Sequence, residues 1–164
     1  MTPDDLRQIV DRLAHGPVVA TAGVRHLYLW CGDPDRLEEI VPAPLLQRLD
    51  LYELVGRLTR TPYAADEARR LLRDRIEQEL RARATSSDRQ VLVVSGCNLL
   101  ARYSVPLQPF YSFTSDHRVV ILVVPRAEAE FPPPPRLPDF VRLVPTVPFD
   151  ALSRAVGEKN VIRE

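Results

Sequence analysis

Uniformly apolar runs alternate along the chain with segments in which apolar residues recur every three or four positions. Three such runs, the second half of residues 24–31 and the whole of 91–94 and 119–124, predict strands covered on both faces, as inside a parallel sheet. The clearest helical spacing is a ladder within residues 66–84, formed by Ala68, Leu72, Ile76 and Leu80. Strands separated by helices predict an α/β layered fold with a mainly parallel central sheet, in a single domain of residues 1–164.

Capping residues and prolines place the other elements. Asp33 followed by Pro34 is typical of a helix start, because a carboxylate can cap the first turn and proline fits the first helical position. The remaining predicted elements are helices at 2–16, 33–42 and 149–156, a short strand running into a helix at 47–59, and a last strand at 140–144.

Residues 126–138 predict a proline-rich surface loop within the domain. Its sequence FPPPPRLP, at 131–138, favours an extended segment, because successive prolines cannot donate hydrogen bonds to a strand ladder. Two roles stay open for this loop. It is either a rigid connector to the closing helix or a docking segment for a groove on a partner, since a preformed polyproline segment loses little entropy on binding.

Charge narrows the class of protein. The 22 basic and 22 acidic residues balance, so bulk charge predicts no direct binding to nucleic acid or to anionic lipid. Acidic and basic residues four positions apart within 66–84 indicate a solvated helix face. The expected pairs are Asp66 with Arg70, Arg73 with Glu77, Arg75 with Glu79, Glu77 with Arg81, and Glu79 with Arg83.

The absence of targeting patterns predicts where the protein is located, and the spacing of its two cysteines predicts their state. No apolar run approaches the length of a membrane span, and the start MTPDDLRQ has acids where a signal peptide would have basic residues, so we expect a cytoplasmic protein without membrane contact. Cys31 and Cys97 lack the spacing of metal ligands and are expected to be reduced thiols of the core.

Small and polar residues follow the predicted strands, where ligands bind in an open parallel sheet. Gly32 and Asp33 follow the first strand, and the stretch SGCN, at 95–98, follows the second. A strand that turns through glycine onto a helix can present backbone N–H groups to phosphate. The glycines also have a structural explanation, since tight turns often need a positive φ.

Other chemistry has weaker support in the sequence. Asp33 and Asp35 could be compared with the paired carboxylates of a phosphatase, but Asp33 is already explained as a helix cap. Ser95 lies in a turn without the G-x-S-x-G spacing of a nucleophile elbow. Arg102 is either a phosphate-contacting arginine or a surface side chain after a helical turn. No catalytic residue and no metal ligand is therefore predicted.

The order of these elements resembles that of small P-loop ATPase-like proteins, in particular the small P-loop protein of BREX phage-defence systems, over residues 1–125. The resemblance places LYLWCGDPDR, at 27–36, in the position of the phosphate loop, and VLVVSGCNLL, at 91–100, in that of the strand whose acid helps to hold magnesium. No lysine follows Gly32 within the loop, and Ser95 and Asn98 stand where acids are expected. Hydrolysis by the usual route therefore lacks both of its main electrostatic contributions, the lysine that neutralises the β- and γ-phosphates and the carboxylate that holds the metal.

The resemblance implies a degenerate, non-hydrolysing P-loop-like subunit that acts through other proteins of a defence complex or DNA-transaction system. An alternative is a nucleotide-binding regulatory switch for ATP or GTP with a non-standard phosphate loop. Its candidate nucleotide-contacting residues are Gly32, Asp33, Arg36, Ser95, Asn98 and Arg102. A third hypothesis is an unrelated α/β interaction module with a similar layout. No cofactor is expected under the first hypothesis.

Overall fold

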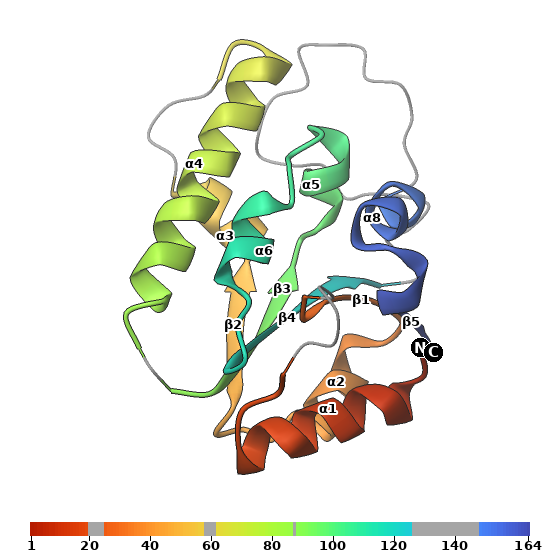
Figure 1. Ribbon diagram of the computed structural model, residues 1–164. Coiled ribbons are helices and arrows are strands. Elements are labelled where there is room, and N and C mark those ends of the chain that lie inside the picture. The colour runs from red at the N-terminus through yellow and green to blue at the C-terminus, as the bar shows by residue number, and fades with distance from the viewer. Residues whose placement is uncertain (20–24, 58–61, 87, 126–147) are drawn as a thin grey trace.

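The computed structural model describes residues 1–19, 25–57, 62–86, 88–125 and 148–164, in which the chain forms an α/β sandwich (Figure 1). The predictions of a proline-rich loop at 126–138 and of a strand at 140–144 lie outside the described residues. No helix in the described ranges is long and apolar enough to cross a membrane.

A five-stranded parallel sheet forms the centre of the fold. Its strands pair in the order β2-β3-β4-β1-β5. They are β1 (Leu27–Cys31), β2 (Leu46–Asp50), β3 (Gln90–Ser95), β4 (Arg118–Val124) and β5 (Val161–Arg163). The prediction that the apolar runs of β3 and β4 form neighbouring parallel strands is confirmed, with Val91 beside Val119 and Val94 beside Leu122.

Helices cover both faces of the sheet (Figure 1). One face carries α1 (Pro3–His15) and α2 (Pro34–Ile40), and the other carries α3 (Leu51–Gly56), α4 (Ala65–Arg83), α5 (Asn98–Arg102), α6 (Gln108–Phe113) and α8 (Pro148–Val156). The chain crosses the sheet in one direction from β1 to β2, and in the opposite direction from β2 through β3 to β4. Right-handed crossovers therefore place α2 and α4 on opposite faces.

Each strand contributes alternate side chains to two separate cores. Leu29 and Leu122 pack under α4 and α8, whereas Trp30 and Ile121 pack under α1 and α2. All four side chains are completely buried. The uniform apolar runs in the sequence follow from this arrangement, because a strand covered on both faces has no solvent-facing positions.

Two details differ from the sequence predictions. In α4 the expected pair of Glu79 and Arg83 forms at 3.1 Å, but Arg73 contacts Asp74 instead, and Arg75 bonds to Gln78. The strand β5 was not predicted, because three residues are too few to show a periodic pattern. It forms by parallel pairing along Leu29 to Cys31 of β1.

Candidate functional site

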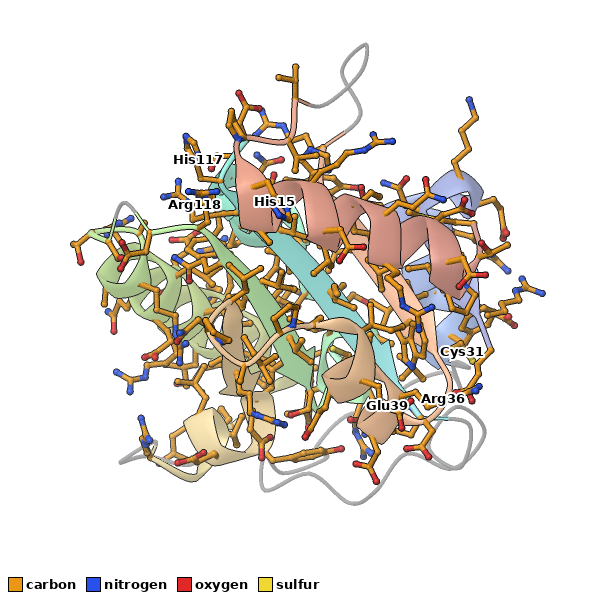
Figure 2. The ribbon with its side chains drawn as sticks, turned by 90° about the horizontal axis from the view of Figure 1, so that it is seen from below. His15, Cys31, Arg36, Glu39, His117 and Arg118 are labelled. Atoms are coloured by element: carbon orange, nitrogen blue, oxygen red, sulfur yellow. The ribbon has the colours of Figure 1, made fainter. Side chains whose placement is uncertain are left out.

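The carboxyl ends of the strands converge at one edge of the sheet, which is where parallel sheets bind ligands. Figure 2 shows this edge near Cys31 and Arg36, at the opposite end of the strands from His15 and His117. The connection that leaves β1 passes to one face of the sheet, and the connection that leaves β3 passes to the other. The chain therefore has a topological switch point around the end of β4, between the ends of β1 and β3.

The turn from β1 into α2 consists of only Gly32 and Asp33. The Asp33 carboxylate caps α2 by accepting a hydrogen bond from the backbone N–H of Asp35, with 2.9 Å between Oδ1 and N, as predicted. The Trp30 indole N–H donates to the carbonyl oxygen of Asp33 over 3.1 Å. Two hydrogen bonds thus fix the turn: one from the buried Trp30 indole, and one that the Asp33 carboxylate accepts as the helix cap.

A carboxylate from the far end of the chain lies on this turn. The backbone N–H of Asp33 donates to Oε2 of Glu164 over 2.7 Å, and Nη1 of Arg36 donates to Oε1 over 2.5 Å. The backbone N–H of Glu164 donates to the carbonyl oxygen of Cys31, which continues the pairing of β5 with β1. The hydrogen bond and the negative charge of Glu164 raise the pKa of Arg36 above its usual value.

Gly32 is required by this close approach and not by its backbone angle. A Cβ at this position would lie 2.5 Å from Oε2 and 2.7 Å from Cβ of Glu164. A positive φ, one explanation that the sequence left open for the strand-end glycines, applies to Gly96, whose φ is 73°, and does not apply to Gly32. The two glycines therefore serve different purposes: one admits a carboxylate, and the other permits a left-handed turn.

The end of β3 is closed by an aromatic side chain. The Tyr52 hydroxyl donates to Oδ1 of Asn98, and a Cβ at Gly96 would lie 2.9 Å from Cδ2 of the Tyr52 ring. Asn98 is 2% exposed, and its Nδ2 has no hydrogen-bond partner. Ser95 is exposed. The position expected for a metal-binding acid therefore presents a hydroxyl and an inward-facing amide.

The six predicted site residues fall into separate groups. Gly32, Asp33 and Arg36 surround Glu164, as described above. Ser95 and Asn98 belong to the end of β3. The guanidinium of Arg102 lies over the Tyr103 ring, 5.9 Å from its centroid.

Two residues of this edge, Tyr52 and Glu164, were not predicted from the sequence. Tyr52 does carry a strand-end signal, because it lies two residues after Asp50, the last residue of β2 and the cap of α3. Glu164 carried no comparable signal, since its role depends on the unpredicted strand β5.

Possible metal ligands and the two cysteines were compared with the arrangement of this edge. Among the described residues no group of three or more His, Cys, Asp or Glu side chains could hold a metal ion. Neither Cys31 nor Cys97 forms a disulfide: Cys31 is half-buried, and Cys97 is buried with its Sγ 3.2 Å from the carbonyl oxygen of Val94. The expected position in the core is confirmed for Cys97, whereas Cys31 is only partly buried.

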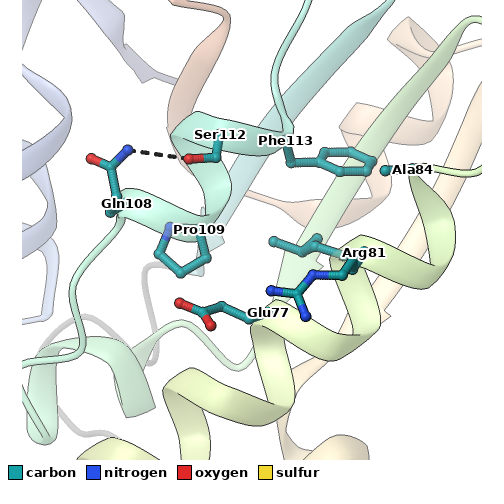
Figure 3. A pocket seen from close by; sticks show the side chains of 8 residues that line it. Glu77, Arg81, Ala84, Gln108, Pro109, Ser112 and Phe113 are labelled. Carbon is teal, nitrogen blue, oxygen red and sulfur yellow. Dashed lines mark hydrogen bonds between the residues drawn. The ribbon is translucent and has the colours of Figure 1, made fainter.

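A separate hollow of about 300 Å³ lies between α4 and α6 (Figure 3). Its floor is apolar, and its rim carries polar side chains, of which Gln108 donates to the Ser112 hydroxyl over 3.1 Å. The lining residues are Glu77, Leu80, Arg81, Ala84, Gln108, Pro109, Ser112 and Phe113. None of the predicted site residues lines this hollow.

In comparisons with known proteins, the chain matches no protein-family model, no curated protein and no solved structure. The fold and the site define an α/β protein whose first strand-to-helix turn is occupied by the chain's own carboxylate. Its function has to be inferred from that arrangement.

Proposed function

We propose that this chain is a P-loop-like protein without nucleotide hydrolysis, which acts through protein contacts as an accessory subunit of a bacterial phage-defence system of the BREX type or of a DNA-transaction system. The P-loop part is supported by the strand order. In this order β4 separates β1, which precedes the glycine turn, from β3. The two strands that the resemblance assigns to the phosphate loop and to the metal-binding acid therefore end on either side of β4, at the switch point of the sheet.

The length of the β1–α2 turn supports the loss of nucleotide chemistry. A phosphate loop of the form G-x-x-x-x-G-K-[ST] spans about eight residues, and its backbone surrounds the phosphates while its lysine neutralises them. Here Gly32 and Asp33 are the whole connection between strand and helix, and neither this turn nor α2 contains a lysine. Two residues cannot surround a chain of phosphates.

The single observation that carries the proposal is the carboxylate of Glu164 on the backbone N–H of Asp33. It occupies the position in which a phosphate oxygen would have to bind. Arg36, the cation closest to the turn in sequence, is paired with the same carboxylate. Asp33 and Asp35 add negative charge beside the turn, which disfavours a nucleotide further.

Calorimetry with magnesium ATP and magnesium GTP, followed by a turnover assay, tests this proposal on the purified chain. We expect neither heat of binding nor release of phosphate. Low-micromolar binding that is lost in Arg36→Ala and retained in Arg48→Ala would overturn the proposal and favour the nucleotide-binding switch. Arg48 is a matched control, because it pairs with Glu38 over 2.5 Å and is exposed to a similar degree.

The assembly part of the proposal is supported by the resemblance to the BREX protein. It predicts that the gene lies beside genes for a large ATPase and a DNA methyltransferase, and that the chain co-purifies with one of their products when they are expressed together. Neighbouring genes of unrelated function, without co-purification, would favour the unrelated α/β interaction module.

A further inference from the structure

The hollow between α4 and α6 has a floor that suits an apolar group (Figure 3). The floor consists of Leu80 from α4 together with Pro109 and Phe113 from α6, and all three side chains are buried. The volume of the hollow, about 300 Å³, lies at the lower end of the range for small-molecule sites. The hollow therefore fits one compact molecule with an apolar body.

Two side chains of opposite charge line the same hollow from successive turns of α4. Figure 3 shows the Glu77 carboxylate and the Arg81 guanidinium on the α4 side of the hollow. Their spacing of four residues predicts an ion pair, but neither side chain has an ion-pair partner within the part of the chain that the structure describes. Glu79 and Arg83, which have the same spacing, do pair, at 3.1 Å. The charges of Glu77 and Arg81 are therefore available to a ligand that lies on the apolar floor.

We propose that this hollow binds a free aromatic α-amino acid. The ammonium group of the ligand pairs with Glu77, its carboxylate pairs with Arg81, and its ring covers the floor beside Phe113. An α-amino acid carries an ammonium group and a carboxylate on one carbon, and this arrangement matches an acid and a base that are one helical turn apart. The inference goes beyond the proposed function, because none of these residues belongs to the β1–α2 turn.

An NMR titration of the purified chain with tryptophan tests the inference, followed at the backbone amides of 77–84 and 110–113. We expect shifts that saturate with a dissociation constant of about 1 mM, which is an ordinary affinity for a ligand of this size. Tryptamine lacks the carboxylate, and indole-3-propionate lacks the ammonium group. Each should bind about fivefold more weakly than tryptophan, because each loses one partly exposed ion pair.

Variants assign each charge of the ligand to its partner. Arg81→Gln should weaken tryptophan about fivefold without weakening tryptamine, and Glu77→Gln should weaken tryptophan without weakening indole-3-propionate. Glu53→Gln and Arg57→Gln are matched controls, because these two residues are also four positions apart on a helix and exposed, and neither lines the hollow. Neither control should change the affinity for tryptophan.

Three results would overturn the inference. The first is the absence of saturable shifts up to about 10 mM tryptophan, and the second is equal weakening by the hollow variants and the control variants. The third is equal binding of N-acetyl-tryptophan amide, which lacks both charges and would indicate a pocket for an apolar side chain of a partner protein. None of these results depends on nucleotide binding at the Asp33 turn, so the proposed function is tested separately.

Discussion

Replacing Gly32 by alanine should destabilise the protein by displacing Glu164. The new Cβ would lie 2.5 Å from Oε2 and 2.7 Å from Cβ of Glu164, and both distances are well below van der Waals contact. Because Cβ of Glu164 is one of the two clashing atoms, rotating the outer part of that side chain does not relieve the clash. The carboxylate must leave the Asp33 N–H, which breaks a charge-assisted hydrogen bond.

The expected cost follows from that bond. Hydrogen bonds to charged groups contribute about 1.5–3 kcal/mol, and an exposed site lies at or below the lower end of this range. We therefore expect Gly32→Ala to reduce the free energy of unfolding by about 1–2 kcal/mol, measured by urea denaturation. Gly16→Ala is the matched control, because nothing lies within 4 Å of a Cβ there and its backbone is extended, so its effect should stay within about 0.5 kcal/mol.

A double-mutant cycle assigns the cause of the effect. In a Glu164→Gly background, most of the cost of Gly32→Ala should disappear, because the atoms that clash with the new Cβ are gone. An undiminished cost in that background, or equal effects of Gly32→Ala and Gly16→Ala in the wild type, would refute the close approach of Glu164.

Three further predictions concern the core, the pH dependence and the end of β3. Leu122→Ala should cost about 2–5 kcal/mol in chemical denaturation, because the side chain is completely buried, whereas Val19→Ala at a 73% exposed position should cost little; an unchanged midpoint for Leu122→Ala would place that side chain outside the core. Burial raises the pKa of Tyr28 to about 12, so the unfolded chain loses this proton first and stability should fall as pH rises from about 10 to 12; unfolding midpoints of Tyr28→Phe should lack that part of the fall. Gly96→Ala should cost more than about 1 kcal/mol in urea denaturation, because φ is positive and the new Cβ meets the Tyr52 ring at 2.9 Å, and a neutral result would contradict this packing.

The buried strands and the long helix could be predicted from the sequence because their patterns have one physical cause each. β3 and β4 are uniformly apolar because both faces are covered, and α4 has a four-residue ladder because one face packs on the sheet. The helix cap at Asp33 was also predictable, because its hydrogen bond joins residues only two positions apart. Interactions within one turn or one strand leave a readable pattern.

The contacts that close the site depend on residues far apart in the chain. The pairing of β5 with β1 and the position of Glu164 on Asp33 depend on strand order, which no local pattern encodes. The sequence also presents Gly32 and Gly96 alike, although one avoids a clash and the other adopts a positive φ. Glycine therefore marks a special backbone position without indicating which constraint applies.

An NMR titration of the Asp33 amide with magnesium ATP tests the central claim most directly, because this N–H is the donor that a phosphate loop would offer and that Glu164 accepts instead. The account predicts that the Asp33 resonance of the wild type does not move at millimolar nucleotide. A shift of that resonance that saturates at low-micromolar magnesium ATP would contradict it.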